Sequence, residues 1–169
     1  MVLTKQELIS SLQNEIRILV HLIGKIDKTK IDYRPTPKQR SFLELLRYLA
    51  IMGPTVLICI KTGAFTREGM TAIWGPADAA AKAMSFDDAV AAIQKQSGDY
   101  ARLLGAWTDD DFRGELDVFG NKTTRGVVAV NMILSAHAAY RTQLFCYLKA
   151  TGHEELNTVN LWMGSDGAM

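Results

Sequence analysis

The sequence lacks an excess of charge of either sign. Nineteen Lys and Arg are balanced by eighteen Asp and Glu, which gives a formal net charge of +1. Proteins that bind nucleic acids usually carry a strong basic excess, because they must neutralise phosphates. No basic run with interleaved aromatic residues is present either. The sequence therefore argues against a nucleic-acid partner.

Cysteine and long apolar runs are also scarce. Cys59 and Cys146 each lie in an apolar run, which is typical of buried thiols in a reducing cytosol. The first residues, MVLTKQELIS, lack the basic segment and apolar stretch of a signal peptide. The longest apolar run, near Pro54 to Ile60, is too short to cross a bilayer. We expect a cytoplasmic protein without a membrane partner.

The common signatures of catalytic and metal sites are missing. The sequence has no phosphate-binding glycine loop, no C-x-x-C pair and no Ser-x-Gly nucleophile turn. Its three histidines, His21, His137 and His153, are not spaced as a ligand cluster. The acidic run 109–111 lacks the glycine and later glutamate of a calcium loop, which favours a solvated helix cap.

What the sequence does contain is helical periodicity. Its 169 residues, 48% of them hydrophobic, predict one domain over 1–169 with a core that needs no disulfides. Capping boxes at Thr4 and Ser41 and a similar cap at Ser85 precede apolar residues spaced three and four apart. We predict helices over residues 4–26, 41–63, 85–107 and 126–150. This pattern predicts an all-α four-helix bundle.

The predicted connections differ in character. Prolines 35 and 37 predict an extended loop over 27–40, and Gly53-Pro54 predicts a kink within the second helix. Residues 64–84 are mixed and are predicted to be irregular. A short hairpin is predicted around 119–121, before the last helix. The tail is expected to pack back on the bundle through apolar anchors at Leu156, Leu161 and Trp162.

Several segments resemble the DinB-like family, which includes the YfiT-like and mycothiol-linked metalloenzymes. They are His21-Leu22 with IDYRPTPKQRS, SFLELLRYLA, the segment AYRTQLFCYLKATG and the tail LNTVNLWMG. The resemblance implies a four-helix bundle with up-down-down-up order, often assembled as a homodimer. It also implies, for several members, a divalent metal such as zinc or nickel held by three histidines. One histidine lies in the second helix and two lie four apart in the last.

This sequence departs from the resemblance at each ligand position. Tyr48 stands in the second helix, and Ala136 and Tyr140 stand in the last. Alanine cannot coordinate a metal, and a phenol loses its proton only near pH 10. The resemblance therefore implies a DinB-like protein that has lost the family metal site and has no cofactor.

The candidate ligand-binding residues are Tyr48, His137, Tyr140 and Arg141. His137 is also the one catalytic candidate, as a general base or a replacement metal ligand, although a buried histidine bonded to a neighbour is the simpler interpretation. Tyr48 and Tyr140 either bind a polar ligand or hydrogen-bond each other and fill the old metal pocket. Arg141 calls for a carboxylate partner, with Glu44 or the run 109–111 as candidates.

Two hypotheses about function follow. In the first, the protein is a metal-free homodimer that binds a small molecule in its central cleft or has a structural role, with its contact face among apolar residues 54–60. In the second, it is a metal-dependent thiol transferase or hydrolase whose zinc or nickel site has been rebuilt around His137.

Overall fold

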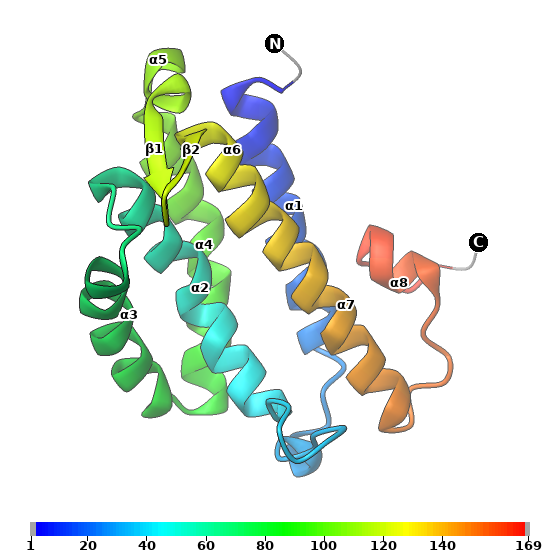
Figure 1. The fold of residues 1–169 in the computed structure, drawn as a ribbon. Coiled ribbons are helices and arrows are strands. Elements are labelled where there is room, and N and C mark those ends of the chain that lie inside the picture. The colour runs from blue at the N-terminus through cyan, green and yellow to red at the C-terminus, as the bar shows by residue number, and fades with distance from the viewer. Residues whose placement is uncertain (1–2, 168–169) are drawn as a thin grey trace.

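The computed structural model describes residues 3–167 and has a bundle of four long helices at its centre. The first three are α1 (Lys5–Ile23), α2 (Phe42–Thr62) and α4 (Phe86–Gly105). The fourth is a continuous rod of α6 (Arg125–Ala129), the π-helical turn η2 (Val130–Leu134) and α7 (Ser135–Ala150). In Figure 1, α1 and the last rod run one way while α2 and α4 run the other. The predicted all-α, up-down-down-up bundle is confirmed.

The predicted capping boxes set the starts of three of these helices. Thr4 accepts a hydrogen bond from the amide of Glu7, and the Glu7 carboxylate accepts one from the amide of Thr4. Equivalent pairs of bonds form at Ser41 and Ser85. These bonds satisfy amide groups that have no partner within the helix, so the chain has a defined point at which each helix begins.

The prediction of an irregular segment over 64–84 is wrong. Residues Arg67–Lys82 form a helix, α3, which packs on α2 and returns the chain to the start of α4. Its one fully buried residue is Ala81, so it lies on the surface of the bundle. Pro76 lies inside it. This proline conceals the helical spacing of Met70, Ile73 and Trp74, which pack against the core.

The connection before the last helix contains the predicted hairpin. Strands β1 (Glu115–Val118) and β2 (Asn121–Thr124) pair antiparallel, with Val118 opposite Asn121. Phe119 and Gly120 both have positive φ, 53° and 86°, as a tight two-residue turn requires. A short helix, α5 (Asp109–Arg113), precedes the hairpin and was not predicted. Its first turn is the acidic run, capped by Thr108.

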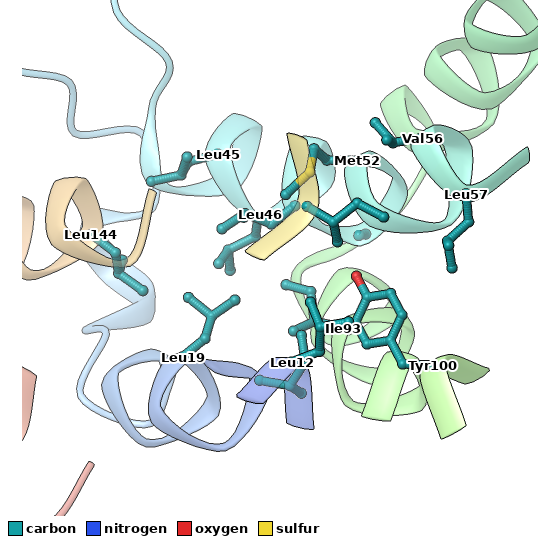
Figure 2. Packing of buried hydrophobic residues seen from close by; sticks show 14 of the residues in the cluster. Leu12, Leu19, Leu45, Leu46, Met52, Val56, Leu57, Ile93, Tyr100 and Leu144 are labelled. Carbon is teal, nitrogen blue, oxygen red and sulfur yellow. The ribbon is translucent and has the colours of Figure 1, made fainter. Parts of the chain in front are cut away.

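The apolar core lies between the four long helices, and Figure 2 shows side chains from all four of them pointing inward. The helix α2 continues unbroken through Pro54. Gly53 lies against Tyr100 of α4, so that a Cβ added at Gly53 would stand 1.8 Å from the Tyr100 hydroxyl oxygen. Only glycine leaves room for this tyrosine.

The apolar character of α2 is more extensive than predicted. By length and composition this helix could cross a membrane, but 61% of the relevant window is buried inside the fold, as in the core helix of a soluble protein. The predicted contact face over 54–60 is wrong, because among these residues only Ile58 is exposed. The homodimer itself stays a prediction. Cys59 is buried as expected, whereas Cys146 is exposed, and both are free thiols.

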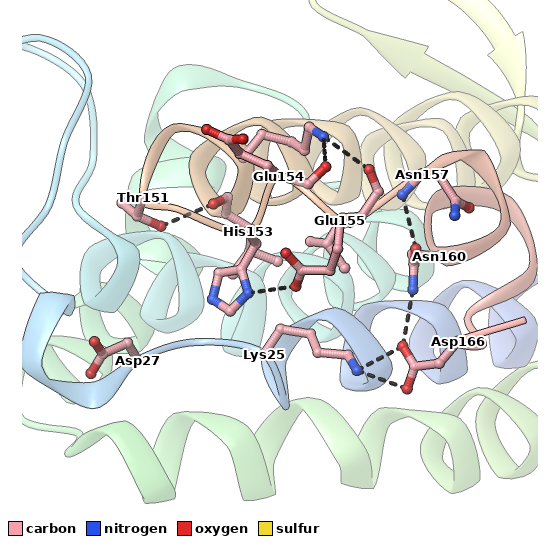
Figure 3. A network of polar contacts seen from close by, with 12 residues as sticks. Lys25, Asp27, Thr151, His153, Glu154, Glu155, Asn157, Asn160 and Asp166 are labelled. Carbon is pink, nitrogen blue, oxygen red and sulfur yellow. Dashed lines mark hydrogen bonds and ion pairs between the residues drawn. The ribbon is translucent and has the colours of Figure 1, made fainter. Parts of the chain in front are cut away.

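The tail packs back on the bundle, as expected, but largely through polar contacts. A 3₁₀ turn, η1 (Lys28–Lys30), follows α1, and the tail carries a short last helix, α8 (Thr158–Met163). Lys25 and Asp166 lie 2.7 Å apart, and Asn160 donates a hydrogen bond to Asp166 (Figure 3). Of the predicted anchors, Leu156 is buried and Trp162 is 64% exposed.

Candidate functional site

The aromatic cluster around Tyr48 joins three helices. The ring of Tyr48, from α2, contacts the ring of Tyr140, from α7, at 5.0 Å between centroids. Trp74, from α3, stacks on Tyr48 at 6.0 Å. Burial and a hydrogen bond with Tyr140 raise the pKa of the Tyr48 phenol well above its usual range. The hydroxyl of Tyr48 is therefore protonated at neutral pH.

A cleft of about 370 Å³ opens beside Tyr48. Loop 34–40, the first turns of α2 and the end of α3 form its walls. Charged side chains dominate the lining, which consists of Arg34, Lys38, Gln39, Arg40, Glu44, Arg47, Tyr48, Asp78, Ala81 and Lys82. The cleft therefore combines an aromatic side chain at one wall with many cations.

The loop that carries Arg40 is anchored to the last helix. Gln143 donates a hydrogen bond to the hydroxyl oxygen of Tyr147 at 2.5 Å, and that hydroxyl donates to the carbonyl of Arg40 at 2.9 Å. The guanidinium of Arg40 lies 4.0 Å from the centre of the Tyr48 ring, a cation–π contact. Both ends of Arg40, backbone and side chain, are thus held in place.

His137 lies in a separate, buried polar chain. Its Nε2 is 2.7 Å from the hydroxyl oxygen of Tyr100, and that hydroxyl donates to the side-chain oxygen of Gln96 at 2.9 Å. A hydroxyl has one hydrogen to donate, so Nε2 of His137 carries the proton in this arrangement. Gln96 in turn donates to the carbonyl oxygens of Leu49 and Ala50.

Pro54 explains why Gln96 is needed. A proline has no amide hydrogen, so the carbonyl four residues earlier, that of Ala50, loses its helical partner. The Gln96 amide lies 3.1 Å from this oxygen and supplies the missing hydrogen bond. The chain of hydrogen bonds that begins at His137 therefore ends on α2, at the carbonyl that Pro54 leaves without a helical partner.

The surroundings of His137 keep its imidazole neutral. Burial lowers the pKa of His137 to about 4. Its Nδ1 atom is buried and has no hydrogen-bond partner among residues 3–167. The π-helical turn η2 ends three residues before it, a distortion that is frequent near functional positions. His137 is 1% exposed.

Arg141 lies away from the Tyr48 cleft. Its guanidinium is 2.8 Å from the carboxylate of Glu15 on α1 and donates to the carbonyl of Leu161 in the tail. The predicted partners, Glu44 and the run 109–111, are wrong: Glu44 pairs with Arg34 instead. The reason is the direction of Arg141, which points from α7 toward α1. Arg141 thus joins α7, α1 and the tail.

The structure therefore divides the four predicted site residues among three places. Tyr48 and Tyr140 share one cluster, His137 lies in the core, and Arg141 holds the tail. Arg40 and Trp74 also belong to the cluster but were not predicted from the sequence, because no spacing rule indicates either of them. Among residues 3–167, no group of three or more His, Cys, Asp or Glu is placed to hold a metal ion.

Comparison with known proteins supports the resemblance at the level of the fold. No family model matches the sequence, and no curated protein matches it. A crystal structure of a DinB-like protein, YjoA from Bacillus subtilis, superposes with a TM-score of 0.66 at 20% sequence identity. The match covers 89% of this chain and 94% of that one. As the sequence predicts, this chain has the fold of a DinB-like protein.

Proposed function

We propose that this protein binds a small molecule in the cleft beside Tyr48, and that it does so without the metal centre that the family resemblance implies. The observation that carries the proposal is the contact between Tyr48 and Tyr140, at two positions where histidine ligands are expected. Tyr48 also lines an open cleft of about 370 Å³. We also propose that the protein is cytoplasmic.

The residues present do not fit a divalent metal. The third ligand position is Ala136, which has no donor atom. The raised pKa of Tyr48 opposes the phenolate form that a metal would need. Zinc and nickel sites in proteins use imidazole, thiolate or carboxylate donors, and the aromatic cluster offers none of these.

A rebuilt metal site around His137 has less support. Its Nε2 is engaged with Tyr100, and its ring is closed off from solvent. Arg141 and Gln143, which lie in the segment that resembles the DinB-like family, are used for other contacts. Arg141 pairs with Glu15, and Gln143 supports Tyr147.

An unpartnered polar atom lies next to the cluster. Nε1 of Trp74 is buried and makes no hydrogen bond within residues 3–167. Buried donors in native proteins nearly always have a partner. Trp74 stacks on Tyr48 but is not one of the residues that line the cleft, so this donor belongs to the aromatic cluster and is not assigned to the ligand.

The test is a nuclear magnetic resonance titration of the ¹⁵N-labelled full chain. The probes are three small aromatic compounds of different charge: benzyl alcohol, benzylamine and phenyl phosphate. We expect at least one of them to shift amide signals saturably, and to shift mainly those of residues 34–48 and 78–82. Shifts scattered over the surface, or none at all with any probe, would contradict the proposal.

A further inference from the structure

The charges around the cleft are unequal in number. Five cationic side chains line it, against two carboxylates, those of Glu44 and Asp78. Both carboxylates are already neutralised: Glu44 lies 3.2 Å from Arg34, and Asp78 lies 2.7 Å from Lys82. The other three cations of the lining, Lys38, Arg40 and Arg47, form no ion pair within residues 3–167, although the chain as a whole is close to neutral.

The side chain of Arg47 is held by a hydrogen bond within the fold, but its positive charge still acts on the cleft. Its guanidinium donates through Nε to the carbonyl of Met84, at 2.7 Å, and so fixes the start of α4 against α2. A backbone carbonyl is a neutral acceptor, so this bond holds the side chain without cancelling its charge. Lys38 adds another cation at the exposed rim.

Arg40 is the cation best placed to bind a ligand. Within residues 3–167 its guanidinium makes no hydrogen bond and no ion pair, so its planar fork of N–H donors is free. Its position is nevertheless fixed, by Tyr48 under the guanidinium and by Tyr147 at its carbonyl. A preorganised guanidinium suits two-point binding of a carboxylate or phosphate, and little side-chain freedom is lost when the anion arrives.

The faces of the Tyr48 ring restrict what a ligand can touch. Trp74 stacks on this ring, and Arg40 lies over it. A ligand therefore meets the edge of the guanidinium rather than the π-face of the tyrosine. The contact that it can make is with the N–H groups of Arg40, helped by the field of Lys38 and Arg47 in a concave site.

We infer that the ligand of this cleft is a small organic oxyanion, a carboxylate or a phosphate monoester, bound through the free guanidinium of Arg40. This inference rests on the proposed function, because it names the class of molecule that the same cleft takes. Gln143 and Tyr147 act as positioning residues for Arg40. Attraction between exposed charges also weakens with ionic strength, so binding should be tighter at low salt.

The test compares phenyl phosphate, benzoate and benzyl alcohol in the same titration, with wild type and three variants. For wild type we expect at least one of the two anions to bind at the cleft and benzyl alcohol to bind at least about tenfold more weakly. Arg40→Gln should weaken the anion by about tenfold or more, and Arg40→Lys, which keeps the charge but loses the fork, by an intermediate factor. Lys122→Gln, on the remote hairpin, should leave binding unchanged.

The outcomes separate the two proposals. If benzyl alcohol binds the cleft as tightly as the anions, or if Arg40→Gln leaves anion binding unchanged, the oxyanion inference is overturned while ligand binding stands. If benzylamine alone binds, the oxyanion inference is overturned while ligand binding stands, and if neither benzylamine nor any of these three probes binds, both proposals fail. Phenyl phosphate and benzoate distinguish the two anion classes by which one binds more tightly. Arg40 is exposed, so its variants should fold, and their amide spectra report this directly.

Discussion

Replacing Gly53 with alanine should lower the free energy of unfolding by roughly 3 kcal/mol or more, a large effect for a single methyl group. The added Cβ would lie 1.8 Å from the hydroxyl oxygen of Tyr100 and 2.9 Å from its Cζ. The tyrosine is fully buried, so it cannot turn out into solvent without opening the core. Displacing it would also break its hydrogen bonds to His137 and Gln96, which leaves buried polar atoms unpaired.

Urea unfolding followed by circular dichroism measures this effect, and Gly98→Ala supplies the matched control. Gly98 lies within the same helix as Tyr100, and a Cβ there meets no atom within 4 Å. Since alanine favours a helix over glycine by about 1 kcal/mol, Gly98→Ala should be as stable as wild type or slightly more so. Equal stability of the two variants would show that Gly53 does not make the close contact described.

Replacing Arg141 with methionine should destabilise the fold by about 3–5 kcal/mol at neutral pH, because it leaves the buried carboxylate of Glu15 without its partner. The Arg141 and Glu15 side chains are 4% and 12% exposed, so water cannot replace the lost contact effectively. The variant also loses the bond to the carbonyl of Leu161, which holds the tail. Thermal or urea unfolding measures the loss.

The stability lost in Arg141→Met should depend on pH. Burial raises the pKa of Glu15 even in the presence of Arg141, which acts to lower it. In Arg141→Met the lowering influence is gone, so the pKa of Glu15 should rise further. A carboxyl group whose pKa is raised in the folded state favours folding at low pH. This stabilisation is lost as the pH rises through the pKa of the group in the folded state. The deficit relative to wild type should therefore shrink as the pH falls toward 4.5 and below.

A double variant separates the charge from the packing. Glu15→Leu combined with Arg141→Met removes both charges, and we expect it to recover most of the stability lost in the single variant. A single variant that loses less than about 1 kcal/mol, or a double variant with no recovery, would show that the pair contributes like an exposed ion pair.

The long helices were predictable because their signals are local. Thr4, Ser41 and Ser85 begin helices through hydrogen bonds to residues three positions along the chain, and the apolar stripes follow at once. The helix α3 escaped prediction because Gly75 and Pro76 interrupt its sequence, two residues that usually mark the end of a helix. Its apolar residues Met70, Ile73 and Trp74 do recur at helical spacing.

The candidate site was only partly predictable. Tyr48 and Tyr140 were named because a resemblance marks their positions, and they do lie in contact. Arg40 was not named, because its place depends on Tyr147 and Tyr48, 107 and eight residues away in the sequence. The partner of Arg141 was misassigned because 126 residues separate it from Glu15. Spacing rules describe neighbours on one helix and cannot report such pairs.

If the cleft beside Tyr48 takes an organic ligand in place of a metal, the untagged wild-type protein should show no stoichiometric binding of Zn²⁺ or Ni²⁺ at neutral pH. Titration calorimetry measures this. The control is the triple variant Tyr48→His, Ala136→His, Tyr140→His, which should bind about one equivalent of metal if the fold places these positions as the resemblance implies. Binding of about one metal ion per wild-type chain, with an affinity like that of the triple variant, would instead mean that the metal site persists.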